Sequence, residues 1–304
     1  MTVVTPQFLL DLNTVMQTQF RDGYEAAREA SFYNSVATTV PSTSASNTYS
    51  WLGDFPHMQE WVGARAAKDM AAHGYSIENK KFESTVNIPR TAIEDDQYGQ
   101  YGTLARHMGQ EAADHPDRLI SEIIAAGAST LCYDGQNFFD TDHPLRENVD
   151  GTGATTTVSN YDATGGGTAW YLLDTRKVLR PFIFQERTRP EMEVKQNPTT
   201  SDEVFTYDRY SYGIRYRCAA GYGFWQMAYC SLNTLNETNF KAARLAMEGV
   251  TADGGRPMGI RPNLLLVPPA LRSEAEALIM TQYKADGGSN PLYRAVDVLV
   301  SAWL

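Results

Sequence analysis

Cysteine is scarce in this chain of 304 residues, which carries only Cys132, Cys218 and Cys230. An odd number at wide spacing argues against a disulfide framework and is typical of a reducing compartment. The chain also has no CxxC pair, which argues against a structural zinc site. Because Cys132 and Cys230 stand among apolar residues, we expect both thiols to be buried and unreactive.

Long apolar runs and an excess of basic charge are missing as well. No window approaches 18 uninterrupted apolar residues, and the N-terminal segment lacks the basic stretch, apolar core and cleavage site of a signal peptide. Lysine and arginine number 26 against 36 aspartate and glutamate, for a formal net charge of −10. Because nucleic acids are bound through basic charge, this balance argues against a generic DNA or RNA binder.

Catalytic and nucleotide-binding motifs are absent. The chain has no GxSxG elbow, no GxxxxGK[ST] loop, no GxGxxG after a strand and no HExxH pair. One cluster, Asp134, Asp140, Asp142 and His143, has ligands that suit a divalent metal. The same residues fit turn chemistry, in which Asp side chains cap the local backbone, and they do not match the calcium-loop template. We therefore predict a turn here, and we assign no catalytic, cofactor or metal residue.

The composition is that of a folded chain. Aromatic residues make up 11% and charged residues 20%, which excludes a disordered protein. The N-terminal third is unusual. An amphipathic helix over 5–33 leads into a small, polar stretch at 35–50 and then a β-rich excursion at 51–96, which holds a helix-compatible segment at 60–74. Long irregular segments are uncommon in compact domains, so we expect these ninety or so residues to pack on other chains.

The remaining two thirds predict a mixture of helices and strands, hence an α+β fold. The longest helical pattern covers 97–128, and Pro116 inside it predicts one kinked helix or two nearly coaxial pieces. Thr234 and Glu237 have the spacing of a capping box for a helix that ends near Gly249. Further strands are expected over 81–90, 262–269 and 295–304, and over several segments of 180–232, one of which is 204–210. Further helices are expected over 169–179 and 269–287.

Six stretches carry a resemblance to a known family, in that family's order. They are FESTVNIPRTAIEDDQYGQY (82–101), NFFDTDHP (137–144), YGIRYRCAAGYGFWQMAYCS (212–231), RPNLLLVPPAL (261–271), GGSNPL (287–292) and VLVSAWL (298–304). Together they resemble the major head (capsid) proteins of Mu-like phages and prophages, and through them the HK97-like capsid fold. The likeness covers nearly the whole chain.

The resemblance implies a division of the chain into four parts. Residues 1–46 would be an N-terminal arm and residues 47–95 an extended β-loop that reaches over a neighbouring subunit. Residues 96–180 would form a peripheral domain with a spine helix at 97–128, and residues 181–304 an axial domain with chain returns to the peripheral domain. The implied function is structural rather than enzymatic: hexamers and pentamers that close into an icosahedral shell around packaged double-stranded DNA.

Partners and contact residues also follow from the resemblance. The chain itself would be the main partner, with a separate scaffolding protein, a portal and decoration proteins, in a virion assembled in the bacterial host cytoplasm. DNA would be enclosed without sequence-specific binding, and no membrane or cofactor is implied. Candidate inter-subunit anchors are the aromatic residues Trp51, Phe55, Trp61 and Phe82, although these could instead fill the loop's own core. Arg90 and Glu94 could form an inter-subunit or a local ion pair.

Two other functions stay open at this point. An encapsulin-like compartment shell would share the fold and enclose protein cargo rather than DNA. A metal-dependent hydrolase would use the loop at 134–143.

Overall fold

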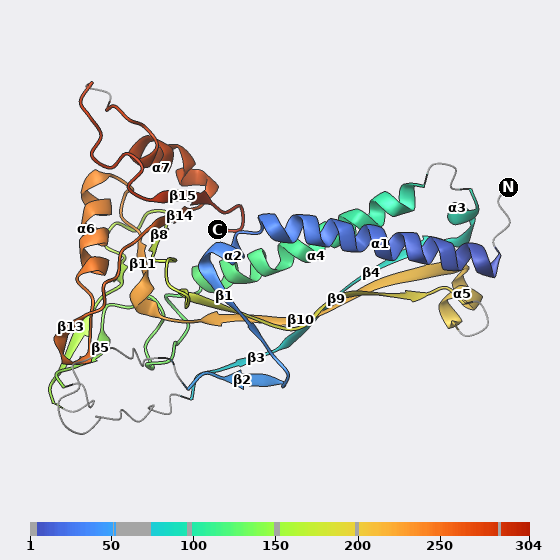
Figure 1. The fold of residues 1–304 in the computed structure, drawn as a ribbon, viewed down its shortest axis with the longest axis horizontal. Coiled ribbons are helices and arrows are strands. Elements are labelled where there is room, and N and C mark those ends of the chain that lie inside the picture. Colours follow the sequence, from blue (N-terminus) through green and yellow to red (C-terminus); the bar gives the residue numbers. More distant parts are fainter. Residues whose placement is uncertain are drawn as a thin grey trace.

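The computed structural model describes residues 5–50, 52, 74–95, 99–148, 153–197, 201–284 and 287–304. Figure 1 shows two parts: an elongated limb, which holds α1, α4 and the long strands β4, β9 and β10, and a compact domain built mainly from the C-terminal third. The predicted anchors Trp51, Phe55 and Trp61 and the helix-compatible segment 60–74 lie outside the described residues, apart from Gly74.

Two long helices pack side by side along the limb. They are α1 (Pro6–Ala30), capped by the Thr5 side chain, which accepts a hydrogen bond from the backbone N–H of Phe8, and α4 (Gln100–Ala125). Two glycines set their spacing. A Cβ on Gly23 would collide with the backbone of Arg106, and a Cβ on Gly109 would collide with the backbone of Phe20. The helices therefore approach each other more closely than larger residues would allow.

A single helix crosses Pro116. The expectation of a kinked helix or two pieces resolves to one helix that starts after Gly99, which has φ +66°. Proline removes one intrahelical hydrogen bond, and the ring of Pro116 is itself buried.

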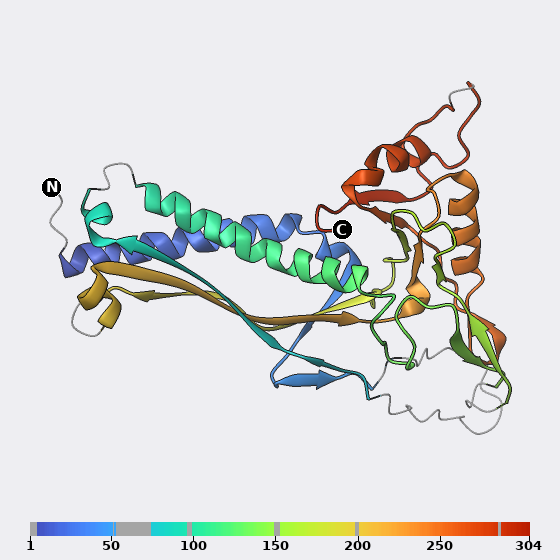
Figure 2. The same ribbon diagram turned by 180° about the vertical axis from the view of Figure 1, so that it is seen from behind.

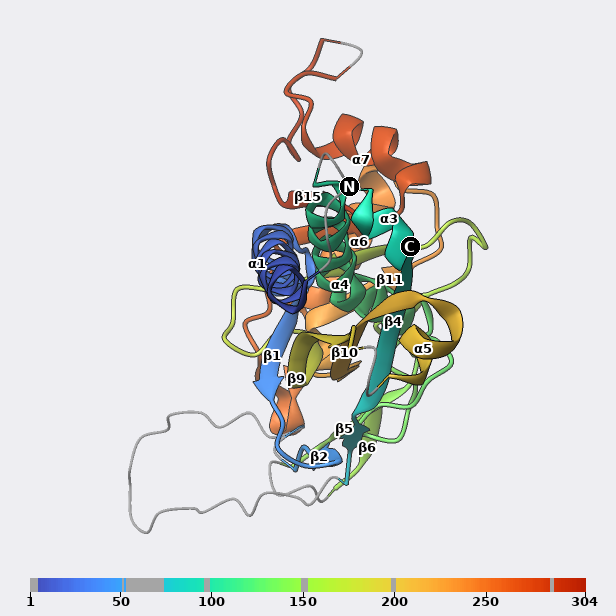
Figure 3. The same cartoon turned by 90° about the vertical axis from the view of Figure 1, so that its right-hand side faces the viewer.

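The limb's sheet has the order β1-β9-β10-β4. Its strands are β1 (Ala37–Pro41), β4 (Lys80–Pro89), β9 (Phe182–Lys195) and β10 (Arg209–Tyr222). Strand β1 is parallel to β9, whereas β9, β10 and β4 run antiparallel, with Tyr216 opposite Phe82. The two helices lie along one face of this sheet, as Figures 2 and 3 show from behind and from one end. In β4 the predicted alternation is confirmed, because Phe82, Val86 and Ile88 are the residues with reduced exposure.

The compact domain is built on a second sheet, with the order β15-β14-β8-β11-β7. Its strands are β7 (Tyr161–Asp162), β8 (Trp170–Leu173), β11 (Ala228–Ser231), β14 (Leu264–Val267) and β15 (Asp297–Val300). Its helices are α6 (Glu237–Glu248) and α7 (Arg272–Ile279), the latter preceded by the 3-10 turn η3 (Pro269–Leu271). All four residues of β8, β11 and β14 are buried, which makes this sheet the centre of the largest apolar core.

Short elements complete the chain. The helices are α2 (Tyr33–Val36), α3 (Arg90–Glu94) and α5 (Asp202–Tyr207), with 3-10 turns η1 (Trp225–Met227) and η2 (Asp253–Gly255). Three two-stranded ribbons pair β2 (Ser46–Thr48) with β3 (Ser76–Glu78), β5 (His143–Arg146) with β6 (Thr155–Val158), and β12 (Thr251–Ala252) with β13 (Arg256–Pro257). None of the described helices combines the length and apolarity needed to span a bilayer.

Several local predictions are corrected. The helix expected over 169–179 is strand β8 and a following loop, since a short apolar run buried on both faces has no distinguishing period. The strand expected over 204–210 begins as helix α5, despite its aromatic residues. The cap of α6 is Asn236, whose side chain accepts from the backbone N–H of Asn239, so the expected capping box with Thr234 is wrong. The last helix and strand are shorter than expected.

The N-terminal third is more integrated into its own chain than its sequence suggests. Helix α1 packs on α4, β1 pairs with β9, and β4 pairs with β10. These described segments therefore pack on their own chain, and their packing on other chains as well stays a prediction. Their apolar residues find partners far along the sequence, which a local pattern does not reveal.

A buried carboxylate fastens the N-terminal segment to α4. The two Asp117 carboxylate oxygens accept hydrogen bonds from the backbone N–H groups of Phe32 and Tyr33, at 3.2 and 2.9 Å, where α2 begins. Burial raises the pKa of Asp117 from 3.8 to about 6, and the two hydrogen bonds only partly oppose this rise. Asp117 thus holds the turn between α1 and α2 against the middle of the limb.

The raised pKa of Asp117 predicts that the free energy of unfolding depends on pH, and that Asp117→Asn removes this contribution. The folded chain holds a proton on Asp117 more tightly than the unfolded chain does, so this group adds stability as the pH falls from about 6 to about 4. Relative to Asp117→Asn, the wild type should gain at most about 3 kcal/mol in free energy of unfolding over that range. Urea denaturation of both proteins at pH 7 and pH 4 measures the difference, and a constant difference between the two pH values would contradict the assignment.

Candidate assembly surfaces

The far end of the limb exposes large apolar side chains. Helix α5 joins β9 to β10 there, and its residues Phe205 and Tyr207 are 85% and 62% exposed. The first turns of α1 lie at the same end, and Leu10 in that helix is 57% exposed (Figure 1). Single exposed apolar residues are ordinary, but a group at the tip of a projecting element is typical of a contact site.

The chain as a whole has more surface than a compact monomer needs. Its accessible area is 16598 Å². A compact monomer of 33.8 kDa would expose about 12,800 Å², so the excess is roughly 30%. A limb made of one sheet and two helices has little interior for its length, and each element keeps an outer face in solvent. Contacts with other molecules are the means by which such a surface becomes buried.

A basic cleft lies where the N-terminal segment meets the loop after β8. It has a volume of about 420 Å³ and is lined by Asn34, Ala37, Thr38, Thr39, Thr175, Arg176, Lys177, Val178 and Arg180. The Thr38 hydroxyl joins β1 to the loop after β8. It accepts a hydrogen bond from the Arg180 backbone N–H at 2.8 Å and donates one to the Val178 carbonyl at 3.4 Å.

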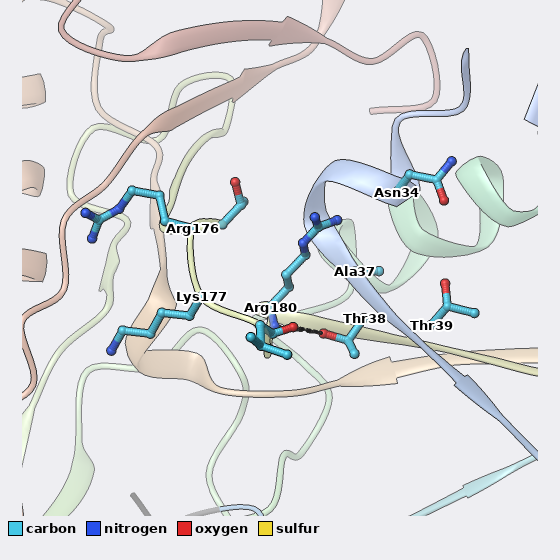
Figure 4. A pocket seen from close by; sticks show the side chains of 9 residues that line it. Asn34, Ala37, Thr38, Thr39, Arg176, Lys177 and Arg180 are labelled. Carbon is cyan, nitrogen blue, oxygen red and sulfur yellow. Dashed lines mark hydrogen bonds between the residues drawn. The ribbon is translucent and has the colours of Figure 1, made fainter. Parts of the chain in front are cut away.

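The three cations of this cleft point in different directions. Figure 4 shows Arg176 and Lys177 extending to one side and Arg180 to the other. Arg176 donates two hydrogen bonds to Asp174, and Lys177 donates to the Met258 carbonyl at 3.1 Å. Because no two cations converge on a common point, the cleft lacks the geometry of a site for a small anion and is better described as a basic surface.

A buried carboxylate orients one of these cations. Asp174 is fully buried, and it accepts from Arg176 and from the backbone N–H of Arg261. Burial alone would raise the pKa of Asp174, but these hydrogen bonds outweigh it and hold that pKa below its usual range. The Asp174 charge is therefore retained and fixes the base of the loop that carries the cleft.

The described contact candidates from the sequence have partners inside the chain. The ring of Phe82 is half-buried and meets the ring of His115 on α4 edge-on, with centroids 4.1 Å apart. Arg90 and Glu94 pair within α3 at 3.0 Å. These contacts favour the alternatives of a local core and a local ion pair, and a role between subunits stays a prediction for all three residues.

The acidic loop folds as a set of turns, as expected. Asp140 accepts from the backbone N–H groups of Asn137 and Thr141, and these bonds hold its pKa below the usual range although burial opposes them. The exposed Asp142 is hydrogen-bonded to Asp140, which raises the pKa of Asp142. His143, by contrast, is fully buried, and its ring stacks on Trp225 at 3.9 Å. The four residues therefore do not form one cluster.

The structure places Cys132 beside the acidic loop, and the sequence prediction had not included this residue among the potential ligands. Cys132 is buried, as expected, and its thiol donates to Asp134 at 3.0 Å. Burial raises the pKa of the Cys132 thiol far above its usual value and that of Cys230 to about 12, which agrees with the expectation of unreactive thiols. The spacing of Cys132, Asp134 and His143 was visible in the sequence, but only the folded loop places all three together.

Comparison with known proteins identifies the family. A family model described as "Mu-like prophage major head subunit gpT" matches residues 9–304. The major capsid protein of Escherichia phage Mu is 41% identical over 307 residues, which cover 99% of this chain and 100% of the relative. The Mu-like prophage FluMu major head subunit of Haemophilus influenzae is 43% identical over 289 residues, with 94% and 92% covered.

A solved structure agrees with these sequence relatives. In the procapsid of bacteriophage JBD30, one chain matches with a TM-score of 0.89 and 51% identity, covering 99% of this chain and 100% of that one. The match extends over the limb and the compact domain together. Since the family model, the relatives and the fold agree over nearly the full length, this chain belongs to the Mu-like prophage major head subunits, the major capsid proteins of Mu-like phages, and has the HK97-like capsid fold.

Proposed function

We propose that this chain builds hexamers and pentamers that close into an icosahedral head shell around double-stranded DNA. The observation that carries the proposal is the projecting limb, whose tip exposes Phe205 and Tyr207. Rotationally related copies can cover such a surface in head-to-tail contacts that close into rings. The shell is part of the virion, and we propose that it assembles in the host cytoplasm.

The limb and the compact domain are assigned separate places in this shell. We propose that the limb is the peripheral domain, with α4 as its spine helix, and that the compact domain is the axial domain at the capsomer centre. In this assignment β9 and β10 are the expected chain return to the limb, whereas β5 to β8 belong to the axial side rather than to the peripheral range 96–180. The ribbon β2–β3 forms the base of the extended loop.

Further partners follow from the same proposal. A head that fills with DNA needs a portal, and we infer a separate scaffolding protein that guides curvature during assembly and decoration proteins on the outer surface. No described segment is assigned to them. The family model and the curated relatives give no support to an encapsulin-like shell or a hydrolase.

Assembly itself is tested by electron microscopy of the purified protein. We expect closed shells, rings or tubes built from repeating capsomers, because the limb surface drives association. Treatment with nuclease should leave protected DNA in particles taken from cells that undergo phage production. A monodisperse small oligomer over a wide range of concentration and salt would contradict the proposal, and particles filled with cargo protein would favour the compartment shell.

The limb tip is tested by removing its apolar area. Phe205→Ser should change the free energy of unfolding of the unassembled chain by no more than about 0.5 kcal/mol, because the side chain is 85% exposed. The same variant should assemble at a concentration several-fold higher than the wild type does, as followed by light scattering. Phe205→Leu, which keeps apolar area, is the matched control and should assemble nearly normally. Equal assembly of the Ser variant and the wild type would exclude Phe205 as a contact.

The acidic charge suits a wall that does not hold its DNA. A subunit with a net charge of −10 has weak non-specific attraction to phosphate, which favours packaging and release. In a mobility-shift assay at low salt, unassembled subunits should leave DNA unshifted. Retarded DNA with a salt slope typical of many phosphate contacts would refute this interpretation of the charge.

A further inference from the structure

Three potential metal ligands meet in the loop that follows α4. Among the residues that the structure describes, Cys132, Asp134 and His143 form the one group whose thiol, carboxylate and imidazole donor atoms all lie within 4.8 Å of one another. Cys132 is 6% exposed and His143 is fully buried. Nitrogen, sulfur and carboxylate oxygen are the donor types that zinc takes in proteins.

The hydrogen bonds of Asn160 determine which nitrogen of His143 carries a proton. The Asn160 side-chain NH₂ donates to the backbone carbonyls of Phe138 and Trp225, and its oxygen accepts from the backbone N–H of Asp140. The orientation of this amide is therefore assigned by three backbone groups. The same oxygen lies 3.2 Å from His143 Nε2, so Nε2 must be the N–H that donates.

The other nitrogen then faces the two remaining ligands. His143 Nδ1 lies 2.7 Å from Asp134 Oδ2, in a hydrogen bond between the ring and the carboxylate. A metal ion bound between these two groups would take the place of the proton in this bond. A ring N–H held by a carbonyl group, with the second nitrogen directed at a cation, is the arrangement of metal-binding histidines.

Stacking fixes the orientation of the His143 ring. The His143 ring lies parallel to Trp225, with an angle of 7° between the planes. On the opposite side of the group, Cys132 Sγ lies 3.0 Å from Asp134 Oδ1. A zinc ion bound at about 2.0–2.3 Å to each ligand holds its donor atoms roughly 3 to 4 Å apart, so small side-chain shifts suffice to admit it.

We propose that Cys132, Asp134 and His143 form a site for a zinc ion that ties the loop after α4 to strand β5. Binding of the ion releases the Cys132 thiol proton to solvent. The resulting thiolate and the Asp134 carboxylate balance the charge of the ion, so the filled site buries no net charge. The Asp134 side chain is 11% exposed, and a water on that side completes the tetrahedron. The role proposed for the ion is structural, because it joins the loop at 132–134 to the first residue of β5.

Metal analysis of the full-length protein tests this site directly. After dialysis against zinc and removal of loosely bound ions, the wild type should hold one zinc per chain, and Cys132→Ser should bind at least tenfold more weakly. Cys230→Ser is the matched control for a buried thiol without a neighbouring histidine, and Asp142→Asn is the control for an acid of the same loop. Both should retain the ion.

Cobalt supplies a second readout that does not depend on the stability of the variants. Bound Co²⁺ should give a thiolate charge-transfer band in the wild type and in both controls, and no such band in Cys132→Ser. Zinc should also raise the Tm of the wild type and leave that of Cys132→Ser unchanged. The absence of stoichiometric zinc in the wild type, or equal zinc in the wild type and Cys132→Ser, would overturn the proposal. His143 and Asp134 would then be only a hydrogen-bonded pair within the chain.

Discussion

The limb is thin, with one sheet and two helices, and this constraint determines how the rest of the molecule is organised. One sheet and two helices bury a single shared interface, which leaves the outer faces of all these elements in solvent. Gly23 and Gly109 bring α1 and α4 as close as backbone contact allows, and the core between helices and sheet is correspondingly thin. Such a chain approaches the burial of an ordinary protein only when other copies cover the limb.

The compact domain supplies the large apolar core that the limb lacks. Strands β8, β11 and β14 of its sheet are buried on both faces, and its core is continuous with the adjoining end of α4 through Ile120 and Ile124. Asp117 fastens the N-terminal segment a few residues earlier on the same helix. The thin limb can thus project from the well-packed compact domain. This arrangement allows one subunit to contact several neighbours while its own fold stays intact.

Sequence patterns predicted the elements whose residues alternate or repeat over a long stretch. The strand with Phe82, Val86 and Ile88 and the long helix around Pro116 are examples. Strand β8 was misjudged because four consecutive buried residues carry no period. The pairing of β1 with β9 joins residues about 145 positions apart, for which a single sequence holds no signal.

The prediction of inter-subunit contact residues is limited in the same way, because a single sequence does not show which residues meet in the fold. Aromatic anchors were chosen by residue type, yet Phe82 turned out to meet His115 in the same chain, and the exposed Phe205 lay in a segment assigned to a strand. Cys132 was correctly expected to be buried. Its proximity to His143 depends on a loop closed by backbone bonds and by Asn160, which the spacing of the residues does not encode.

The central claim, that association completes the burial of the limb, is tested most directly by hydroxyl-radical footprinting of the unassembled and assembled protein. The account predicts that Phe205 and Tyr207 are labelled strongly in the unassembled chain and become protected in the particle, whereas the buried Phe138 is protected in both states. Equal labelling of Phe205 and Tyr207 in both states would contradict it.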